Sequence, residues 1–463
     1  MVKKVRKSKD SSFKPFHYKS LSQLEREIEK LHLNIPISKD ISILKKKKRF
    51  KNIFIPNRLA IQPMEGFDAK QDGSPSILTN KRYQRYANSG VALIWFEATA
   101  FVREGRSNPH QLMITEKNLE DFRKLVQKTR NLCNRTLQEL GFNNKCLLIL
   151  QINHSGRYSK KEEEAHPIKA FNYKPLEIKK EKSKIKGKII SDEELQEIEN
   201  QWIDSIFLAK EAGFDGADIK SCHGYLINEL LSAHRREGSK YGGPKLRDRA
   251  KLLLNIISKS VERMDDKSDF FLTTRISVYN GIPFPYGFGV EKSSGEEFPA
   301  PVNLDEPKKL ISLLYKKGIR LINISAGNPH HKPYITRPYD TPVKGGEKPA
   351  EHPLISLNRI YTLTEEIKSS QPDDMIIIGS ALSYLRQYSG YIAAGLINKK
   401  IVDICGFGRM AFANPQFPKQ LFTEGVINKK KTCISCSKCS ELMKEGKETG
   451  CVIRNPLYKQ NNS

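Results

Sequence analysis

The chain has 463 residues, and its 79 Lys and Arg against 52 Asp and Glu give a formal net charge of +27. This length suits a single large α/β barrel, so it does not require two domains. The positive excess is dispersed over lysine-rich stretches with few aromatic residues among them, such as residues 45–48, 179–188 and 429–431. We interpret it as solvated surface and expect no nucleic-acid partner.

Hydropathy gives no sign of a membrane or export segment. No stretch approaches the roughly 18 continuous apolar residues of a membrane span, and the basic residues 1–7 are not followed by an apolar run. We therefore expect a cytoplasmic protein that does not bind membranes. The oligomeric state stays open, with a homo-oligomer as one alternative.

The predicted elements begin with a basic N-terminal extension over residues 1–45, which includes an amphipathic helix at 21–33. From residue 57 onward, short apolar runs alternate with longer segments of helical periodicity. The predicted strands are 59–62, 91–97, 147–152, 216–220, 271–277, 321–325, 375–378 and 402–406. Helices between them include 192–212, 246–264, 306–317 and 357–369. Eight strands with seven crossovers predict a (β/α)8 TIM barrel, of the α/β class, over residues 46–425.

Reactive side chains follow the fourth predicted strand. Lys220, His223 and Tyr225 place an ammonium, an imidazole and a phenol near one strand end. Barrel enzymes carry their chemistry at the carboxyl ends of their strands. These three groups can bind or protonate a carbonyl-bearing substrate, so we predict a catalytic site there.

Glycines follow the last two strands. Gly379 ends the seventh strand, and Gly408 with Arg409 follows the eighth. Backbone N–H groups at glycines can approach a phosphate, and an arginine beside them can pair with it. The sequence therefore predicts a phosphorylated ligand at this edge of the barrel.

A cysteine-rich segment occupies residues 426–463. Cys433, Cys436, Cys439 and Cys451 have the spacing C-x2-C-x2-C-x11-C. Four thiolates so spaced can hold one 4Fe-4S cluster or a structural zinc ion. The three cysteines at x2, x2 spacing fit a cubane cluster better than the paired knuckles of zinc sites, and zinc remains the alternative.

Six ordered segments together resemble the old yellow enzyme family of FMN-dependent barrel oxidoreductases. The resemblance covers about residues 50 to 425. The segments are Asn57-Arg58 with Pro63-Met64, then residues 97–106, 150–157, 223–226, 241–243 and 406–409.

The resemblance implies roles for particular residues. Tyr225 matches the proton donor of the family, and His223 and Lys220 match the pair that binds the substrate's carbonyl oxygen. The remaining matched positions would bind FMN. They are Pro63, Met64, Glu65, Ala98, Gln151, Arg275, Gly327, Gly379, Ser380, Gly408 and Arg409.

Two of these positions depart from the family pattern. Lys220 stands where histidine is common, and Glu65 stands where relatives often have threonine or cysteine near the flavin. A lysine still binds an oxyanion, but it is a compact point charge and so changes the range of substrates. A carboxylate at position 65 would oppose negative charge on the flavin unless it points away or is protonated. The substrate, rather than the flavin, is what these departures leave open.

The activity that the resemblance implies is reduction of an activated C=C bond. The substrate would be a small molecule with a carbonyl or similar electron-withdrawing group, and Tyr225 would supply the proton. Iron–sulfur members of the family carry a similar cysteine row, so electrons would come from NADH or NADPH directly, or from a redox protein partner through the 4Fe-4S cluster.

Three other functions stay open at this point. A dehydrogenase or demethylase that oxidises amines would use the same flavin and cluster. A flavin barrel acting on tRNA would use the positive charge, although no basic, aromatic-rich module is present. A barrel that has lost its chemistry would act as a binding protein.

Overall fold

The computed structural model describes residues 12–162, 164–177, 179–180, 183–184, 187–265, 268–293 and 295–462. The first 11 residues of the expected N-terminal extension, and part of the lysine-rich stretch at 179–188, lie outside the described residues.

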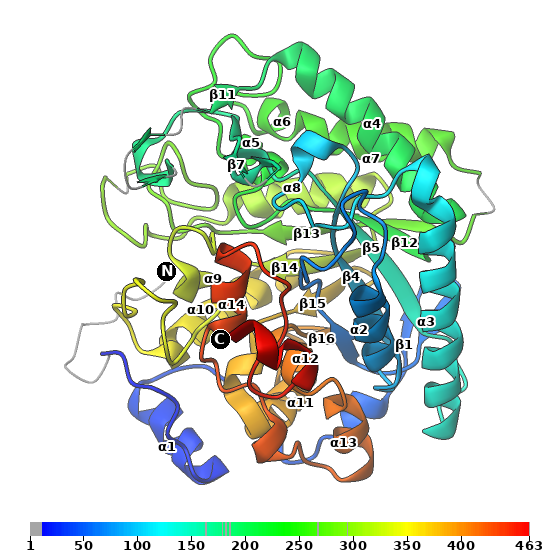
Figure 1. Ribbon diagram of the computed structural model, residues 1–463. Helices are drawn as coiled ribbons and strands as arrows, with labels where there is room; N and C mark the ends of the chain where they lie inside the picture. Colours follow the sequence, from blue (N-terminus) through cyan, green and yellow to red (C-terminus); the bar gives the residue numbers. More distant parts are fainter. Residues whose placement is uncertain are drawn as a thin grey trace.

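Eight of the described strands run parallel and close into one barrel, in the order β12-β13-β14-β15-β16-β3-β4-β5 (Figure 1). Every predicted run overlaps one of these strands, so the (β/α)8 barrel is confirmed. The strands are β3 (Leu59–Ile61), β4 (Leu93–Ala100), β5 (Leu147–Asn153), β12 (Gly216–Ile219), β13 (Phe271–Ser277), β14 (Leu321–Ser325), β15 (Ile376–Gly379) and β16 (Ile404–Phe407). Because they are parallel, all their carboxyl ends meet at one mouth.

The second barrel strand, β4, is longer than the sequence predicts. It continues past residue 97 to Ala100, with a register shift against β5 between Phe96 and Thr99. The polar residue Glu97 suggests a strand end, but its carboxylate is buried and pairs with the guanidinium of Arg82. This pairing lets a charged residue lie inside the strand.

Helices cover the outside of the barrel (Figure 1). The helix predicted over residues 246–264 is divided at Ala250, where the buried Arg249 side chain donates to the carbonyl oxygens of Gly243 and Leu231. The apolar periodicity of the sequence does not reveal the hydrogen bonds of a buried arginine. The helices are α1 (Leu21–Lys30), α2 (Ile77–Ala87), α3 (Leu119–Glu139), α4 (Asp192–Glu211), α5 (Leu226–Leu231), α6 (Leu246–Arg249), α7 (Lys251–Arg263), α8 (Asp305–Lys316), α9 (Pro333–Thr336), α10 (Pro353–Ser369), α11 (Ser389–Asn398), α12 (Arg409–Ala413), α13 (Phe417–Thr423) and α14 (Lys438–Lys444).

A hairpin closes the end of the barrel opposite the mouth. Its strands are β1 (Lys48–Phe50) and β2 (Ile53–Ile55), which pair antiparallel. Phe50 and Ile55 are buried in a cluster with inward-facing residues of the barrel strands. The Phe50 ring meets that of Phe271 edge-on, with the centroids 4.8 Å apart. The apolar seal at this end leaves the other end for polar chemistry.

Short two-stranded sheets lie in the connection between β5 and α4. Their strands are β6 (Lys160–Lys161) with β7 (Glu164–Ala165), β8 (Ile168–Lys169) with β11 (Lys188–Ile189), and β9 (Lys179–Lys180) with β10 (Ser183–Lys184).

The N-terminal extension lies against the barrel helices. Leu24 of α1 is fully buried, and the backbone N–H of Ser38 donates to the carbonyl oxygen of Tyr391 in α11 at 3.0 Å. At Gly395 a side chain would lie 2.4 Å from the carbonyl oxygen of Pro36, so only glycine allows this approach. No described helix has the length and apolar character to cross a membrane.

The cysteine-rich segment, red in Figure 1, lies over the barrel mouth beside α2 and α9. The Thr449 N–H donates to the carbonyl oxygen of Gly66, in the loop after β3, at 2.6 Å. The Asp340 N–H donates to Ser435 O at 3.0 Å. Leu78 of α2 packs against a buried cluster of Leu442, Val452 and Tyr458. The segment is therefore held to loops from several barrel strands.

Candidate active site

The predicted site residues gather at the mouth because each lies at or just after the carboxyl end of a strand. The first strand supplies Pro63, Met64 and Glu65, and the next two supply Ala98 and Gln151. The loop after β12 supplies Lys220, His223 and Tyr225. The remaining strands supply Arg275, Gly327, Gly379, Ser380, Gly408 and Arg409.

Glu65 and Lys220, the two departures from the family pattern, are partners. The Lys220 ammonium donates to Glu65 Oε1 at 2.9 Å, and both side chains are almost fully buried. The Tyr225 hydroxyl donates to the same oxygen at 3.2 Å, while Ser107 Oγ donates to Glu65 Oε2 at 3.3 Å. The Lys220 ammonium also lies 3.7 Å from the centroid of the Tyr225 ring.

These contacts keep the Tyr225 phenol neutral. Burial, and then the negative charge of Glu65, raise the pKa of Tyr225 well above its ordinary value. A buried phenol beside a carboxylate resists ionisation because the phenolate would be both desolvated and repelled. Tyr225 is therefore protonated at neutral pH and can donate its proton only to a strongly basic acceptor.

His223 is also neutral. Burial, and then the charges of Arg275 and Lys220, lower the pKa of His223 well below its ordinary value. Its Nε2 lies 2.9 Å from Ser325 Oγ at the end of β14. Its φ of 67° lies in the left-handed region, where the backbone N–H donates to Ser277 Oγ at 3.1 Å. This unusual backbone conformation directs the loop toward Tyr225.

An aromatic wall flanks Tyr225 and was not predicted as a unit. The Tyr158 and His330 rings stack with centroids 3.8 Å apart, and each lies about 6 Å from the Tyr225 ring. Asn328 Nδ2 donates to the Tyr158 hydroxyl at 2.8 Å. Burial lowers the pKa of His330 to about 3, so this wall is uncharged at neutral pH.

Gln151 and Arg275 share a buried partner, Asp218, which sequence reasoning missed. Gln151 Nε2 and Trp95 Nε1 donate to Asp218 Oδ2 at 2.6 and 2.8 Å. The Arg275 backbone N–H donates to Asp218 Oδ1 at 2.7 Å. Burial raises the pKa of Asp218 to about 6, although these hydrogen bonds act to lower it. Asp218 thereby orients Gln151, and its position inside a strand conceals it in the sequence.

Two guanidiniums lie together at the side of the mouth formed by β14 and β16. Arg409 Nη2 donates to the Pro338 carbonyl oxygen at 2.6 Å, and Arg409 Nη1 is buried without a partner among the described residues. Arg337 Nη1 is in the same situation. Burial, and then the charge of Arg409, lower the pKa of Arg337 to about 10. Two cations with open donors, and with no carboxylate of the described residues bonded to them, favour an anion here.

Arg337 belongs to no motif that the sequence analysis identifies. It follows α9 in a loop, 12 residues beyond the end of β14, and the only local signal is the arginine–proline pair with Pro338. Ser107 was missed for the same reason, since it lies in a loop between elements.

FMN fits the donors that this mouth leaves open. Arg275 Nε is buried without a partner among the described residues, as is Arg409 Nη1. The backbone at Gly408 comes so close to Met64 that a side chain would lie 2.9 Å from its Sδ. An anionic cofactor placed along these residues would satisfy the open guanidinium donors, with Gln151 and Arg275 toward its ring and Arg409 toward its phosphate. Ser380 Oγ already donates to the Ile324 carbonyl oxygen at 2.8 Å, so its backbone is what remains for a ligand.

All four C-terminal cysteines line one pocket, which Arg409 also borders. Cys433 is buried and the other three are partly exposed. Within the described residues, no group of three or more His, Cys, Asp or Glu is arranged to hold a metal ion. Burial raises the pKa of Cys451 to about 12, so this thiol is protonated in the absence of a bound metal.

A closed (β/α)8 barrel with an anion site and a buried phenol at its mouth is a framework for a flavin-dependent oxidoreductase. Comparison with known proteins defines the family. Residues 48–383 match the model of the NADH:flavin oxidoreductase / NADH oxidase family. The chain belongs to this family, as the resemblance to old yellow enzyme predicts.

Two curated relatives are named as an NADH oxidase and an NADPH dehydrogenase. The NADH oxidase of Thermoanaerobacter brockii is 26% identical over 395 residues, which are 84% of this chain and 52% of that protein. An NADPH dehydrogenase of Listeria innocua is 26% identical over 348 residues, or 72% of this chain and 89% of the relative. The chain thus spans about half the length of the first relative and most of the second.

Solved structures share the fold at lower identity. A 2-naphthoyl-CoA reductase in complex with 2-naphthoyl-CoA superposes with a TM-score of 0.66 at 18% identity, over 90% of this chain and 57% of that one. An old yellow enzyme homologue from Zymomonas mobilis gives a TM-score of 0.58 at 18% identity, over 84% and 94% of the two chains.

Proposed function

We propose that this protein is an FMN-dependent oxidoreductase that reduces an activated C=C bond of a small molecule carrying a carbonyl or similar group. The observation that carries the proposal is the buried, neutral Tyr225 phenol at the barrel mouth, beside a neutral His223 and an anion site at Arg409. Membership of the NADH:flavin oxidoreductase family supports it.

Each side chain has a defined task in this reaction. FMN, when bound, supplies the hydride for one alkene carbon. Tyr225 holds its proton at the hydroxyl oxygen and gives it to the neighbouring carbon. His223 is fixed by Ser325 and offers a neutral donor toward the substrate oxygen, on which negative charge develops. The aromatic wall of Tyr158 and His330 excludes water from the phenol.

A Tyr225→Phe variant tests the proton transfer. We expect alkene reduction to slow by about 10²- to 10⁴-fold, while reduction of the flavin by NADH or NADPH is unchanged. The matched control is Tyr361→Phe, which removes the hydroxyl of another buried tyrosine, on α10. Anaerobic stopped-flow spectroscopy measures both steps, and equal alkene reduction in the two variants would refute the role of Tyr225.

The amine-oxidising alternative is favoured by one observation. Because Glu65 already neutralises Lys220, the mouth presents less positive charge to a substrate than the sequence suggests, and a neutral or cationic amine would be accepted more readily. The same Tyr225→Phe variant separates the two functions, since amine oxidation does not require the phenol to protonate a carbon. A barrel that only binds ligands would show no flavin reduction with any donor.

We also propose that the four C-terminal cysteines hold a 4Fe-4S cluster rather than zinc. Around one zinc ion four sulfurs lie at about 2.3 Å from the metal and therefore close to one another, whereas a cubane cluster binds each thiolate at a different iron and spaces them further apart. All four cysteines line one pocket, and in the part of the chain that the structure describes no group is arranged for a single ion, which supports the wider site.

Metal analysis tests this proposal. We expect about four iron atoms and matching acid-labile sulfide per chain. They should be lost in Cys433→Ser but retained in the control Cys133→Ser, whose thiol on α3 is buried. One zinc ion per chain without iron would overturn it.

The electron donor is tested in the same preparation. Rapid bleaching of the flavin by NADH or NADPH under anaerobic conditions makes a separate redox protein unnecessary. If neither nicotinamide reduces the flavin, a protein donor acting through the cysteine pocket is required.

A further inference from the structure

The Glu65 carboxylate contacts two ionisable side chains of the loop after β12, Lys220 and Tyr225. Its Oε1 accepts from Lys220 and from Tyr225, and its Oε2 accepts from Ser107. We propose that Glu65 is a positioning residue that keeps Tyr225 protonated and directs the charge of Lys220 away from the substrate. The proposal rests on the proposed role of Tyr225 as the proton donor.

The first step of the argument is charge balance. Lys220 and Glu65 are 4% and 7% exposed, so neither charge is relieved by water and each requires the other. An ammonium held by a carboxylate at 2.9 Å has less positive charge to offer a substrate oxygen than a free ammonium. His223, Ser325 and backbone groups then bind the substrate oxygen, and Lys220 does not.

The second step concerns the phenol. Lys220 lies against the Tyr225 ring, and without Glu65 this cation would stabilise the phenolate and release the proton early. Glu65 reverses that effect, because its negative charge and its hydrogen bond both favour the protonated phenol. The carboxylate therefore sets the acid strength of Tyr225.

Other groups near the carboxylate do not substitute for Lys220. Glu97 on β4 and the Cys222 thiol both experience the charge of Glu65, but neither is cationic. Among the described residues, Lys220, Tyr225 and Ser107 contact Glu65, and its charge also acts on Glu97 and Cys222.

A spectroscopic titration of Tyr225 tests the proposal without using turnover. The ultraviolet phenolate signal of each protein is corrected by subtracting the titration of the same protein carrying Tyr225→Phe. In Glu65→Gln, Lys220 loses its counter-charge, and we expect the Tyr225 phenolate fraction at a given alkaline pH to rise about tenfold or more over wild type. In Lys220→Met, which leaves the carboxylate, it should not rise.

Two further variants serve as controls for the titration. Glu65→Gln/Lys220→Met removes both charges, so it avoids an unpaired buried ion, and Tyr225 should still ionise at lower pH than in wild type because no carboxylate opposes it. Glu347→Gln removes the acid of the exposed Lys332–Glu347 pair and should leave Tyr225 unchanged. An unchanged phenolate fraction in both Glu65→Gln and the double variant would overturn the proposal.

The pH dependence of turnover completes the test. If Tyr225 is the donor, the alkaline fall of kcat/KM in Glu65→Gln moves to lower pH together with the phenolate titration. If the Tyr225 titration shifts in Glu65→Gln while Tyr225→Phe remains fully active, the role of Glu65 stands and the proposed function is refuted. If Tyr225→Phe loses activity but the titration does not shift in Glu65→Gln, the proposed function stands and the role of Glu65 is refuted.

Discussion

Single residues at the barrel mouth carry charges that only the folded chain can explain. Glu65 and Lys220 each stand out in the sequence as unusual, yet they are 155 residues apart and nothing local connects them. Closing the barrel places the ends of β3 and β12 around one opening, and the two departures become an ion pair. Motifs predict Tyr225, His223 and Arg409 as site residues. They do not point to Asp218 or Arg337, because a strand interior and a loop provide no pattern.

Arg82 is a second buried charge that depends on distant partners. Its guanidinium pairs with Asp68 and with Glu97, and all three side chains are almost fully buried. Burial raises the pKa of Glu97 to about 7, and the charge of Arg82 opposes this rise. The Gly66 N–H donates to the other oxygen of Glu97 at 2.6 Å, which joins this cluster to the loop that carries Glu65.

Replacing Arg82 with methionine should therefore be severely destabilising. It leaves two buried carboxylates without a cation, and we expect a loss of about 3–5 kcal/mol in the free energy of unfolding. Arg263→Met is the control, because its pair with Asp204 is exposed and should contribute less than about 1 kcal/mol. Urea unfolding monitored by circular dichroism measures both values, and equal losses would contradict the role of Arg82.

At the scale of elements, apolar runs located all eight barrel strands, since each strand is buried on both sides and reads as a continuous hydrophobic segment. Boundaries were less accurate where a buried ion interrupts the pattern, as Glu97 does in β4 and Arg249 does between α6 and α7. The turn and cap chemistry of α10 was also outside the prediction, which began that helix at residue 357 rather than Pro353.

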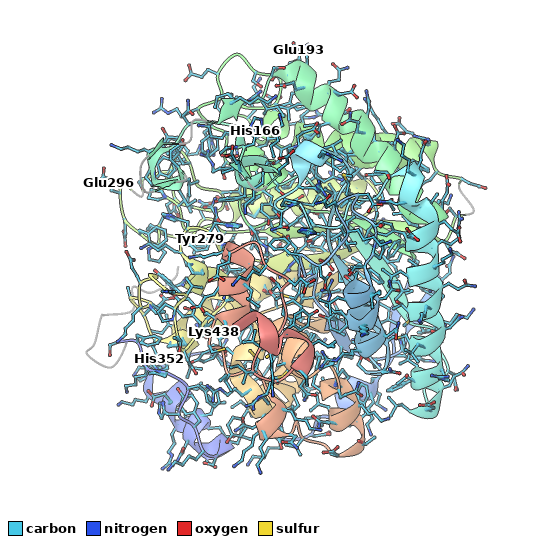
Figure 2. The ribbon with its side chains drawn as sticks, in the orientation of Figure 1. His166, Glu193, Tyr279, Glu296, His352 and Lys438 are labelled. Carbon is cyan, nitrogen blue, oxygen red and sulfur yellow. The ribbon has the colours of Figure 1, made fainter. Side chains whose placement is uncertain are left out.

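The start of α10 depends on a neutral histidine. His352 Nδ1 accepts from the Leu354 N–H at 3.2 Å, and Nε2 lies 3.7 Å from Glu27 of α1. Figure 2 shows His352 close to α1. Burial lowers the pKa of His352 to about 4. The unfolded chain, with an ordinary histidine, binds this proton more readily, so its contribution to stability is lost as pH falls from about 6.5 toward 4.

A His352→Asn variant should weaken this pH dependence. Asparagine is a favourable N-cap that does not titrate in this range. The unfolding temperature of wild type should fall more steeply than that of the variant between about pH 6.5 and pH 4. The exposed His166, replaced by asparagine, is the control and should follow wild type. Parallel profiles for His352→Asn and wild type would exclude the capping effect.

At the scale of the whole molecule, the C-terminal segment is joined to the barrel in ways that its cysteine spacing does not reveal. Lys438, labelled in Figure 2, marks the start of α14 within this segment. The fold of the barrel and the spacing of the four cysteines could be read in order along the chain. Contacts such as Thr449 with Gly66 could not, because they join residues almost 400 positions apart and follow no repeating pattern.

Tyr458 anchors the end of this segment. It is 2% exposed, it packs against Leu442 and Val452, and its hydroxyl donates to Asp68 Oδ2 at 3.4 Å. Tyr458→Ala should lower the free energy of unfolding by about 3–5 kcal/mol if the segment unfolds with the barrel. Tyr458→Phe keeps the ring and loses only a long hydrogen bond, so it should cost about 1 kcal/mol.

Limited trypsin digestion provides the second readout of the same change. Cleavage near Lys444 and Lys447 should accelerate in Tyr458→Ala and not in Tyr458→Phe. Accelerated cleavage without loss of barrel stability would mean that the segment unfolds separately.

The Glu65–Lys220 pair also constrains the order in which substitutions at positions 65 and 220 could be acquired. A chain with histidine at 220 and threonine at 65 has no net charge to bury, but acquiring either the lysine or the glutamate alone leaves an uncompensated ion in the core. The two positions are therefore epistatic: each substitution is harmful by itself and acceptable with the other. Engineering this enzyme toward the substrates of its relatives by restoring histidine at position 220 would have to replace Glu65 in the same step.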